Sequence, residues 1–326
     1  MAYNEGDDFA THFTKDDENP NEEPDNAYQE SVYISFVDNE KGIGGVWRIG
    51  LEHNQDKANV CATLWREGST SYNYFYRHHP KPKADWSNMQ AGPLTIKVVE
   101  PWKKIHAVLK DDEAGLEVEL EWNARTPAFD FKKDVPEQLI GAFREHYQQF
   151  GDFEAKVKWG SEKFDISGTC FRDHSWGVRE WERGWKFVIT GGVLRDKDLF
   201  YVMMGHRQGR MNGEGVVLTH FDPDKDTRVK FHISDFRAVF DPPPIVAAQS
   251  YVLHTPDRDF RVWGRAVAPT LVMPFGKAHF TTALYKWDVD GETVYGITDN
   301  FAGHHFSHNS YPFPTQGGDG STGAAL

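Results

Sequence analysis

Residues 171–181, FRDHSWGVREW, bring carboxylates, an imidazole, two indoles and two guanidinium groups into one short stretch. The preceding residues, KFDISGTC, alternate between apolar and polar types as a strand does. Continued alternation would place two sets of side chains on opposite faces: Cys170, Arg172, His174 and Trp176 on one, and Phe171, Asp173 and Ser175 on the other. An acid and an imidazole on a buried β element are costly unless both are hydrogen-bonded, which marks this cluster as a candidate for chemistry.

The chemistry that these residue types suggest is acid catalysis. An apolar surround raises the pKa of a carboxyl group, so Asp173 is the candidate acid and His174 its partner. Arg179 would position the carboxyl group, and the indoles of Trp176 and Trp185 would form an aromatic wall facing a developing cation. The alternative that stays open is structural: the acid, the imidazole and the guanidinium would form a satisfied polar cluster that closes the end of a barrel.

Two further stretches contain histidines. GHRQGR places His206 on a strand after VMM, and Tyr201 precedes it on the same strand, so both are weaker candidates for substrate contact. GHHFSH, residues 303–308, lacks a carboxylate at a defined spacing, and we expect no metal site there. No phosphate-binding glycine loop is present, and we expect no cofactor.

The composition favours a protein that binds an apolar ligand. Aromatic residues make up 14% of the 326 positions, and the formal net charge is −13. Aromatic rings line pockets for bulky apolar molecules as well as cores, whereas negative charge disfavours binding to nucleic acid. The two cysteines, Cys61 and Cys170, lack a CxxC spacing, which predicts two separate buried thiols.

The chain carries no pattern of export or membrane insertion. No basic stretch followed by an apolar run opens the sequence, and no apolar run approaches the roughly 18 residues that span a bilayer. The sequence therefore predicts a cytoplasmic protein. A lipophilic substrate could still bring it transiently to a membrane surface, and the oligomeric state does not follow from the sequence.

Short alternating strands at about ten-residue spacing predict an all-β protein with two antiparallel barrel or sandwich domains. One segment breaks the alternation, because Leu139, Ile140, Phe143 and Tyr147 have helical spacing, and it predicts a bridging amphipathic helix over about 136–150. The expected organisation is an acidic disordered arm, two domains and a flexible tail, with bounds at 1–29, 30–165, 166–312 and 313–326.

The stretch GTCFRDHSWGVREW resembles the Asp-His-x-Trp-Gly motif of carotenoid 1,2-hydratase, also called hydroxyneurosporene synthase, and of lipocalin-like Diels–Alderases. The layout of two lipocalin-like domains is similar over roughly residues 30–305, while the specific signal is confined to 168–185. The resemblance implies acid-catalysed chemistry on a largely apolar, unsaturated molecule bound between the domains. By motif position it implies that Asp173 is the acid, with His174 and Trp176 beside it.

Three functions are therefore expected or kept open. The first is a cofactor-independent lyase or isomerase, that is a hydratase, dehydratase or cyclase, acting on a polyene-like or isoprenoid compound. The second is a lipocalin-like carrier of a lipophilic ligand, which would explain the aromatic residues but not an acid beside an imidazole. The third is a carbohydrate-active lyase, since Tyr, His, Arg and Trp in a β cleft can serve sugar elimination.

Overall fold

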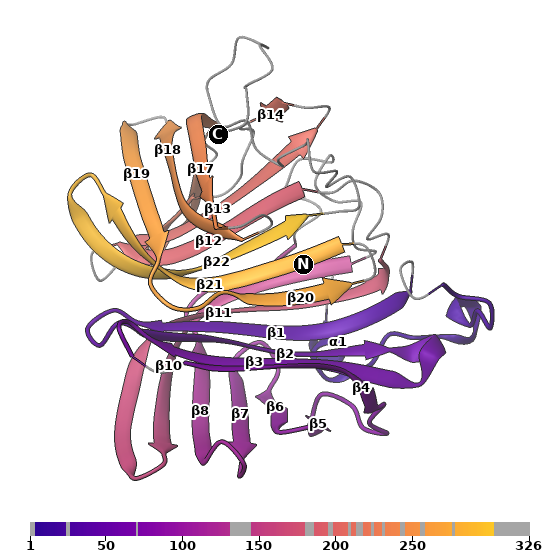
Figure 1. Cartoon of the computed structure of the whole chain (residues 1–326). Helices are drawn as coiled ribbons and strands as arrows, with labels where there is room; N and C mark the ends of the chain where they lie inside the picture. Colours follow the sequence, from indigo (N-terminus) through magenta and orange to yellow (C-terminus); the bar gives the residue numbers. More distant parts are fainter. Residues whose placement is uncertain are drawn as a thin grey trace. The chain divides into compact units, whose positions relative to one another are not determined.

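The computed structural model describes residues 4–23, 27–69, 71–130, 145–179, 186–194, 198–207, 210–212, 218–222, 225–229, 232–241, 245–254, 258–275 and 278–302. The chain divides into two compact units (Figure 1). Unit 1 consists of Met1–Lys133 and Gly141–Glu180, and unit 2 of Asp134–Ile140 and Trp181–Leu326. None of the helices in these described ranges has the length and apolar character needed to cross a membrane.

Unit 1 is built on one antiparallel sheet with the strand order β4-β3-β2-β1-β11-β10-β8-β7-β6-β5. In Figure 1 strands β1 to β3 run across the view while β7, β8 and β10 run down it, so the sheet curls around its own core. Its strands are β1 (Tyr28–Asp38), β2 (Ile43–Glu52), β3 (Lys57–Arg66), β4 (Tyr72–Pro80), β5 (Met89–Ala91), β6 (Leu94–Glu100), β7 (Lys104–Asp111), β8 (Leu116–Ala124), β9 (Phe129–Asp130), β10 (Glu145–Trp159) and β11 (Glu162–Val178).

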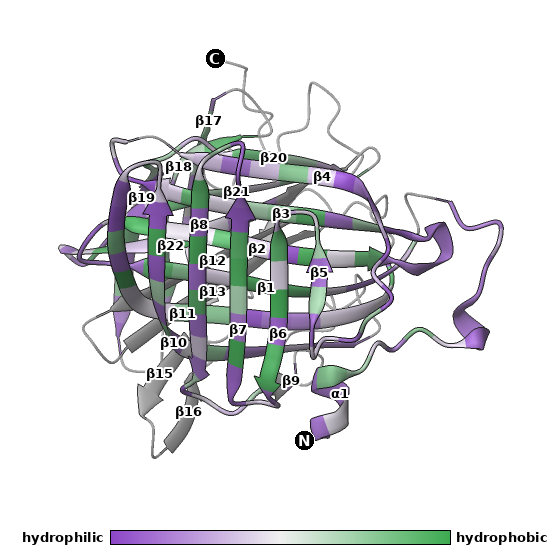
Figure 2. Cartoon of the chain, turned by 90° about the horizontal axis from the view of Figure 1, so that it is seen from below, coloured by the Kyte–Doolittle hydropathy of each residue, from purple (hydrophilic) through white to green (hydrophobic). Residues whose placement is uncertain are grey.

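Alternation along these strands fills the core of unit 1. In β8 the buried residues Leu116, Val118, Leu120 and Trp122 alternate with exposed or half-buried polar residues, and Figure 2 shows the resulting bands of colour along β7 and β8. The core includes Trp47, Trp86 and Trp122, which are fully buried. Cys61 and Cys170 are buried free thiols, as the sequence predicts.

Unit 2 repeats the antiparallel β architecture. Its main sheet has the order β14-β13-β12-β22-β21-β19-β18-β17, with β20 paired to β21 and a separate β15–β16 pair. The strands are β12 (Lys186–Leu194), β13 (Asp198–Arg207), β14 (Arg210–Asn212), β15 (Leu218–Asp222), β16 (Lys225–Val229), β17 (His232–Phe240), β18 (Val246–His254), β19 (Asp259–Ala266), β20 (Leu271–Phe275), β21 (Ala278–Val289) and β22 (Glu292–Ala302).

The helix expected over 136–150 is wrong for its last six residues, and residues 136–144 lie outside the described ranges. Residues 145–150 begin β10, which pairs with β11 along its whole length. Both faces of this part of β10 are buried or nearly so, so its residues show no polar–apolar alternation. A strand buried on both faces cannot be distinguished from a helix by periodicity alone.

The expected domain boundary also differs from the structure. A division between residues 165 and 166 falls inside β11, which pairs with β1 on one side and β10 on the other. β11 therefore belongs entirely to unit 1, together with the motif that it carries. Close packing fixes this position of the strand, because a Cβ atom added at Gly168 would lie 2.2 Å from the carbonyl oxygen of Val37 in β1.

The residues expected to form a loose acidic arm are ordered where the structure describes them. Helix α1 (Glu5–Phe9) starts with a capping box made by Asn4 and Asp7, and the 3-10 helix η1 (Lys15–Asp17) follows. Phe9 packs against the core of unit 1, and the backbone N–H of Trp86 donates to its carbonyl oxygen at 2.9 Å. We call residues 4–23 the N-terminal segment.

Candidate functional site

Strand β11 presents the FRDHSWG motif on two opposite faces. Its inner face, which carries the core residues Ile166 and Cys170, also carries Arg172, His174 and Trp176, all buried. Its outer face carries Phe171, Asp173 and Ser175. This confirms the partition that alternation predicts. It also means that Asp173 and His174, neighbours in sequence, point away from each other, so the expected acid–imidazole pair is not formed by these two residues.

The inner face contains a buried ion pair with the N-terminal segment. Arg172 Nη1 donates to Asp8 Oδ1 at 2.7 Å and Nη2 donates to Asp8 Oδ2 at 3.1 Å. Nε and Nη2 of Arg172 also donate to Gln149 Oε1, and the indole of Trp122 has its centroid 4.9 Å from the guanidinium carbon. Burial would raise the pKa of Asp8, but the charge and hydrogen bonds of Arg172 hold it below its ordinary value.

A chain of hydrogen bonds continues from this pair to His174. The hydroxyl of Tyr147 lies 2.5 Å from Asp8 Oδ1 and 2.9 Å from His174 Nδ1. His174 Nε2 lies 2.9 Å from Glu30 Oε1. Burial raises the pKa of Tyr147 well above its ordinary value, and burial lowers that of His174 against the opposing effect of Glu30. Tyr147 is therefore a phenol at neutral pH.

Glu30 is the acceptor at the centre of this inner-face network. Its carboxylate accepts from the backbone N–H of His12 at 2.8 Å and from the indole Nε1 of Trp86 at 3.2 Å, and it also lies 3.0 Å from His12 Nδ1. Burial acts to raise the pKa of Glu30, but hydrogen bonds from His12 and His174 outweigh it and hold the pKa well below its ordinary value. The carboxylate is therefore ionised although it is fully buried.

Trp176 takes part in the inner-face network rather than in an open wall. Its indole stacks on the imidazole of His12 with ring centroids 3.7 Å apart and an interplanar angle of 6°. Only 7% of the residue is exposed. The role of substrate wall predicted for Trp176 therefore needs the N-terminal segment to leave, and in this structure that segment covers it.

The outer face carries a row of polar residues across four neighbouring strands. Arg48 of β2, Tyr33 of β1, Asp173 of β11 and Gln148 of β10 lie side by side in register. In the next row Ser31, Ser175 and His146 are aligned, with the two serine hydroxyls 3.4 Å apart. Arg179 follows β11 and donates from Nη2 to Ser175 Oγ at 2.9 Å.

Two guanidinium groups act on Asp173. Burial lowers the pKa of Arg48, and the charge of Asp173 opposes this effect. Burial and the charge of Arg48 lower the pKa of Arg179 to about 9, again against the attraction of Asp173, so Arg179 is charged at neutral pH. Opposite charges favour the ionised form of a carboxyl group. The sequence-based argument expects a carboxyl group that keeps its proton, and the charges of these two guanidinium groups act in the opposite direction.

The histidine on the same face as Asp173 is His146. It is aligned with Ser175, one row from Asp173, and diagonal neighbours on adjacent strands lie roughly 7–8 Å apart. Burial, followed by the charges of Arg179 and His174, lowers the pKa of His146 well below its ordinary value. The outer face thus combines a carboxylate with a neutral imidazole, and the second of these could not be recognised in a segment predicted as helix.

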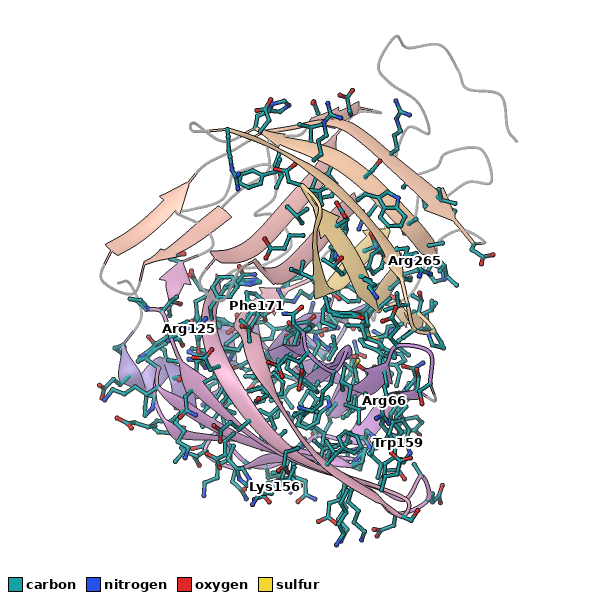
Figure 3. The ribbon with its side chains drawn as sticks, turned by 90° about the vertical axis from the view of Figure 1, so that its left-hand side faces the viewer. Arg66, Arg125, Lys156, Trp159, Phe171 and Arg265 are labelled. Atoms are coloured by element: carbon teal, nitrogen blue, oxygen red, sulfur yellow. The ribbon has the colours of Figure 1, made fainter. Side chains whose placement is uncertain are left out.

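Aromatic rings adjoin the polar row on the outer face. The ring centroids of Tyr33 and Phe171 are 6.3 Å apart, and those of Phe150 and Phe171 are 5.4 Å apart. Phe171 is labelled in Figure 3, with Lys156 further along the same face of the β10–β11 hairpin. Phe171 and Asp173 are only half-buried, unlike Arg172 and His174 on the inner face of the same strand. An apolar molecule on these rings would have polar groups beside it.

Three predicted contact residues cannot be placed in the same way. Trp185 lies outside the described ranges, and Tyr201 and His206 lie in β13, of which the structure describes the backbone. Sequence reasoning in turn missed Asp8, Glu30, His146 and Tyr147. Polar residues at core-facing strand positions, such as Glu30 directly before SVYISF, are the signal that could have revealed part of this set.

Comparisons with known proteins show a family and a fold. Residues 14–302 match a family model described as a domain of unknown function, DUF7064. No curated protein matches the chain. A crystal structure of an AttH-like protein from Nitrosomonas europaea is similar, with a TM-score of 0.60 and 10% identity over 89% of this chain and 96% of that one. Kievitone hydratase from Nectria haematococca matches with a TM-score of 0.53 and 9% identity, over 84% of this chain and 88% of its own.

These likenesses concern the fold. The two antiparallel β units agree with the lipocalin-like, all-β class predicted from the sequence. At 10% identity or less, the likeness extends to architecture and not to individual residues.

Proposed function

We propose that this chain, which belongs to the family of the domain of unknown function DUF7064, is a cofactor-independent enzyme of the lyase or isomerase type. Its substrate would be a hydrophobic, unsaturated compound of the polyene or isoprenoid kind, which it would hydrate, dehydrate, isomerise or cyclise. The observation that carries the proposal is the outer face of β11, where Asp173 adjoins aromatic rings and two guanidinium groups.

The proposed role of Asp173 is proton transfer at carbon. Arg48 and Arg179 favour its carboxylate form, which can remove a proton next to a double bond and return one at another position. This is the proton movement that dehydration and isomerisation need. His146, a buried neutral imidazole on the same face, is suited to forming a hydrogen bond with a hydroxyl group of the substrate.

Substrate contact is assigned to the aromatic rings beside the row. Tyr33 and Phe150 are buried and pack beside Phe171, and the half-buried ring of Phe171 would contact a carbon chain and hold the reacting bond against Asp173. Trp185, Tyr201 and His206 stay sequence-based predictions for further contacts. A fold shared with a protein named as a hydratase supports the reaction class, because it shows that this architecture accommodates such chemistry.

The test uses heavy water and a matched pair of variants. Purified protein is incubated in D₂O with a lipid extract from its expression host and with a panel of conjugated polyenes, and mass spectrometry records deuterium uptake, hydration or loss of water. The wild type should change at least one compound. Asp173→Asn should reduce the rate by about 10²–10⁴-fold, the usual contribution of a proton-transfer group.

Asp165→Asn is the control, since Asp165 is an exposed carboxylate on the same strand and the same face. It should react as the wild type does. Equal turnover by Asp173→Asn and the wild type would end the assignment of Asp173. Stoichiometric recovery of an unchanged lipophilic compound from both proteins would replace the enzyme by a carrier.

A further inference from the structure

The inner face of unit 1 holds three imidazoles around one carboxylate. His12 Nδ1 and His174 Nε2 lie 3.0 and 2.9 Å from Glu30 Oε1, and His53 Nε2 lies 3.5 Å from Glu30 Oε2. The ligand atoms of His12, Glu30 and His174 are all within 4.8 Å of one another. The four residues come from the N-terminal segment, β1, the 3-10 helix η3 (His53–Gln55) and β11, so only the folded chain assembles them.

His53 is aimed into this cluster without a hydrogen bond. Its side chain is 7% exposed, and its Nε2 finds no hydrogen-bond partner within the described part of the chain. Stacking on Phe13, with centroids 4.6 Å apart and an interplanar angle of 5°, fixes the ring. A buried ring nitrogen without a partner is costly, and a cation between it and Glu30 would satisfy both.

The carboxylate of Glu30 is surrounded by imidazoles. Glu30 is fully buried, and among the described residues its ion-pair partners within 4.0 Å are these three imidazoles. A buried carboxylate is stable only when it is paired or when it coordinates a metal ion.

The distances from Glu30 to the three imidazoles are in the range that zinc ligands require, and three of the four groups, His12, Glu30 and His174, also lie close to one another. Zinc binds imidazole nitrogen and carboxylate oxygen at about 2.0–2.2 Å, which places neighbouring ligand atoms about 3.3 Å apart. The distances from Glu30 oxygens to the three imidazole nitrogens are 2.9, 3.0 and 3.5 Å. Histidine and carboxylate are ligand types that zinc accepts.

The hydrogen bonds behind His174 are consistent with metal coordination. Tyr147 has one hydroxyl proton, which both Asp8 Oδ1 and His174 Nδ1 can accept. If His174 Nε2 binds a cation, the ring proton sits on Nδ1 and donates to the Tyr147 oxygen, whose own proton then goes to Asp8. A ligating histidine supported by an outer hydrogen bond that ends at a carboxylate is the usual arrangement at zinc sites.

We propose that His12, Glu30, His53 and His174 form a binding site for one divalent transition-metal ion of the zinc type. His12, Glu30 and His174 would be the core ligands and His53 the fourth, and a sphere closed by four protein ligands is the mark of a structural rather than a catalytic metal. The ion would fasten the N-terminal segment and η3 to β1 and β11. This site lies on the inner face and Asp173 on the outer face, so the metal proposal does not depend on the reaction assigned to Asp173.

The test is metal binding by the full chain. Protein stripped with a chelator and desalted is titrated with Co²⁺, whose visible absorption reports its coordination geometry, and with Zn²⁺, whose retention is measured by elemental mass spectrometry. The expected result is one equivalent of either ion, tetrahedral Co²⁺ absorption and a higher melting temperature with Zn²⁺.

His12→Gln and Glu30→Gln should each weaken Zn²⁺ binding by at least about tenfold and remove the tetrahedral absorption. His78→Gln, at an exposed histidine of β4, should bind as the wild type does. If Glu30→Gln does not fold, the binding measured for His12→Gln tests the proposal. The His12 side chain lies on the N-terminal segment and is 15% exposed, so this substitution should be tolerated. A wild type that retains no metal, or ligand variants that bind like His78→Gln, would overturn the proposal.

Discussion

Asp8 and Arg172, separated by 164 positions in the chain, form a bidentate ion pair with both side chains buried. One partner belongs to the N-terminal segment and the other to the inner face of β11. The pair is stabilised further by Gln149 and by the hydroxyl of Tyr147. The ion pair attaches the N-terminal segment to unit 1, although the acidic composition of that segment predicts a solvated arm.

Removing the charge of Asp8 should therefore be strongly destabilising. Asp8→Asn leaves the Arg172 guanidinium buried without its counter-charge, and breaking such a pair costs about 3–5 kcal/mol. The free energy of unfolding can be measured from urea denaturation of the full chain followed by tryptophan fluorescence. Glu162→Gln is the control, because its pair with Arg66 is exposed and should contribute about 0–1 kcal/mol. Equal losses in the two variants would contradict the role given to the buried pair.

Stability should fall in acid through the same residue. Burial tends to raise the pKa of Asp8, but Arg172 holds it below the ordinary value of 3.8. Folding therefore favours the ionised form, and the stabilisation is complete above about pH 4 and is lost as the pH falls through the lower, folded-state pKa. Melting temperatures measured between pH 6 and pH 3 should drop more steeply for the wild type than for Asp8→Asn. Parallel curves would show that Asp8 titrates alike in the folded and unfolded chain.

The N-terminal segment should resist proteolysis. Phe9 packs on the core and Phe13 stacks on His53, so chymotrypsin has no unfolded site at either ring. Mass spectrometry after brief digestion should find these bonds intact in the wild type and cut in Asp8→Asn. Rapid cleavage of the wild type after both phenylalanines would show that the N-terminal segment is disordered, as its composition predicts.

Tyr147→Phe should weaken the inner-face network without changing its packing. The variant keeps the ring but leaves Asp8 and His174 each one hydrogen bond short, which costs about 1–3 kcal/mol in a buried setting. Tyr76→Phe, at a ring that is 48% exposed, should change the free energy of unfolding by less than about 0.5 kcal/mol. Chemical denaturation of metal-free protein gives both values. A loss no larger than that of Tyr76→Phe would mean that the hydroxyl is not needed there.

Local alternation was sufficient to predict much of the β architecture. Antiparallel strands make up both units, and the two faces of the motif in β11 are those that period-two alternation predicts. Such features depend on neighbours in sequence, and a single chain contains the information for them.

The composition of the site depends on contacts that sequence neighbours do not encode. Asp8 and His12 reach Arg172 and Glu30 from a segment whose acidity resembles that of a solvated arm. His146 was hidden because β10 is polar on both buried faces there, which erases the strand period. The capping box of Asn4 and Asp7 was a local sign that the segment is ordered, although not of where it docks.

The alternation of side chains along β11 restricts the insertions and deletions that this strand can accept during evolution. Because side chains alternate, the insertion or loss of one residue between Cys170 and Trp176 would turn the strand over locally, exchanging Asp173 for His174 at every contact. His174 faces Glu30 and Asp173 faces the side of Arg48 only in the present register of the strand. Substitutions can tune either side separately, but length variation in this strand should be absent from working relatives.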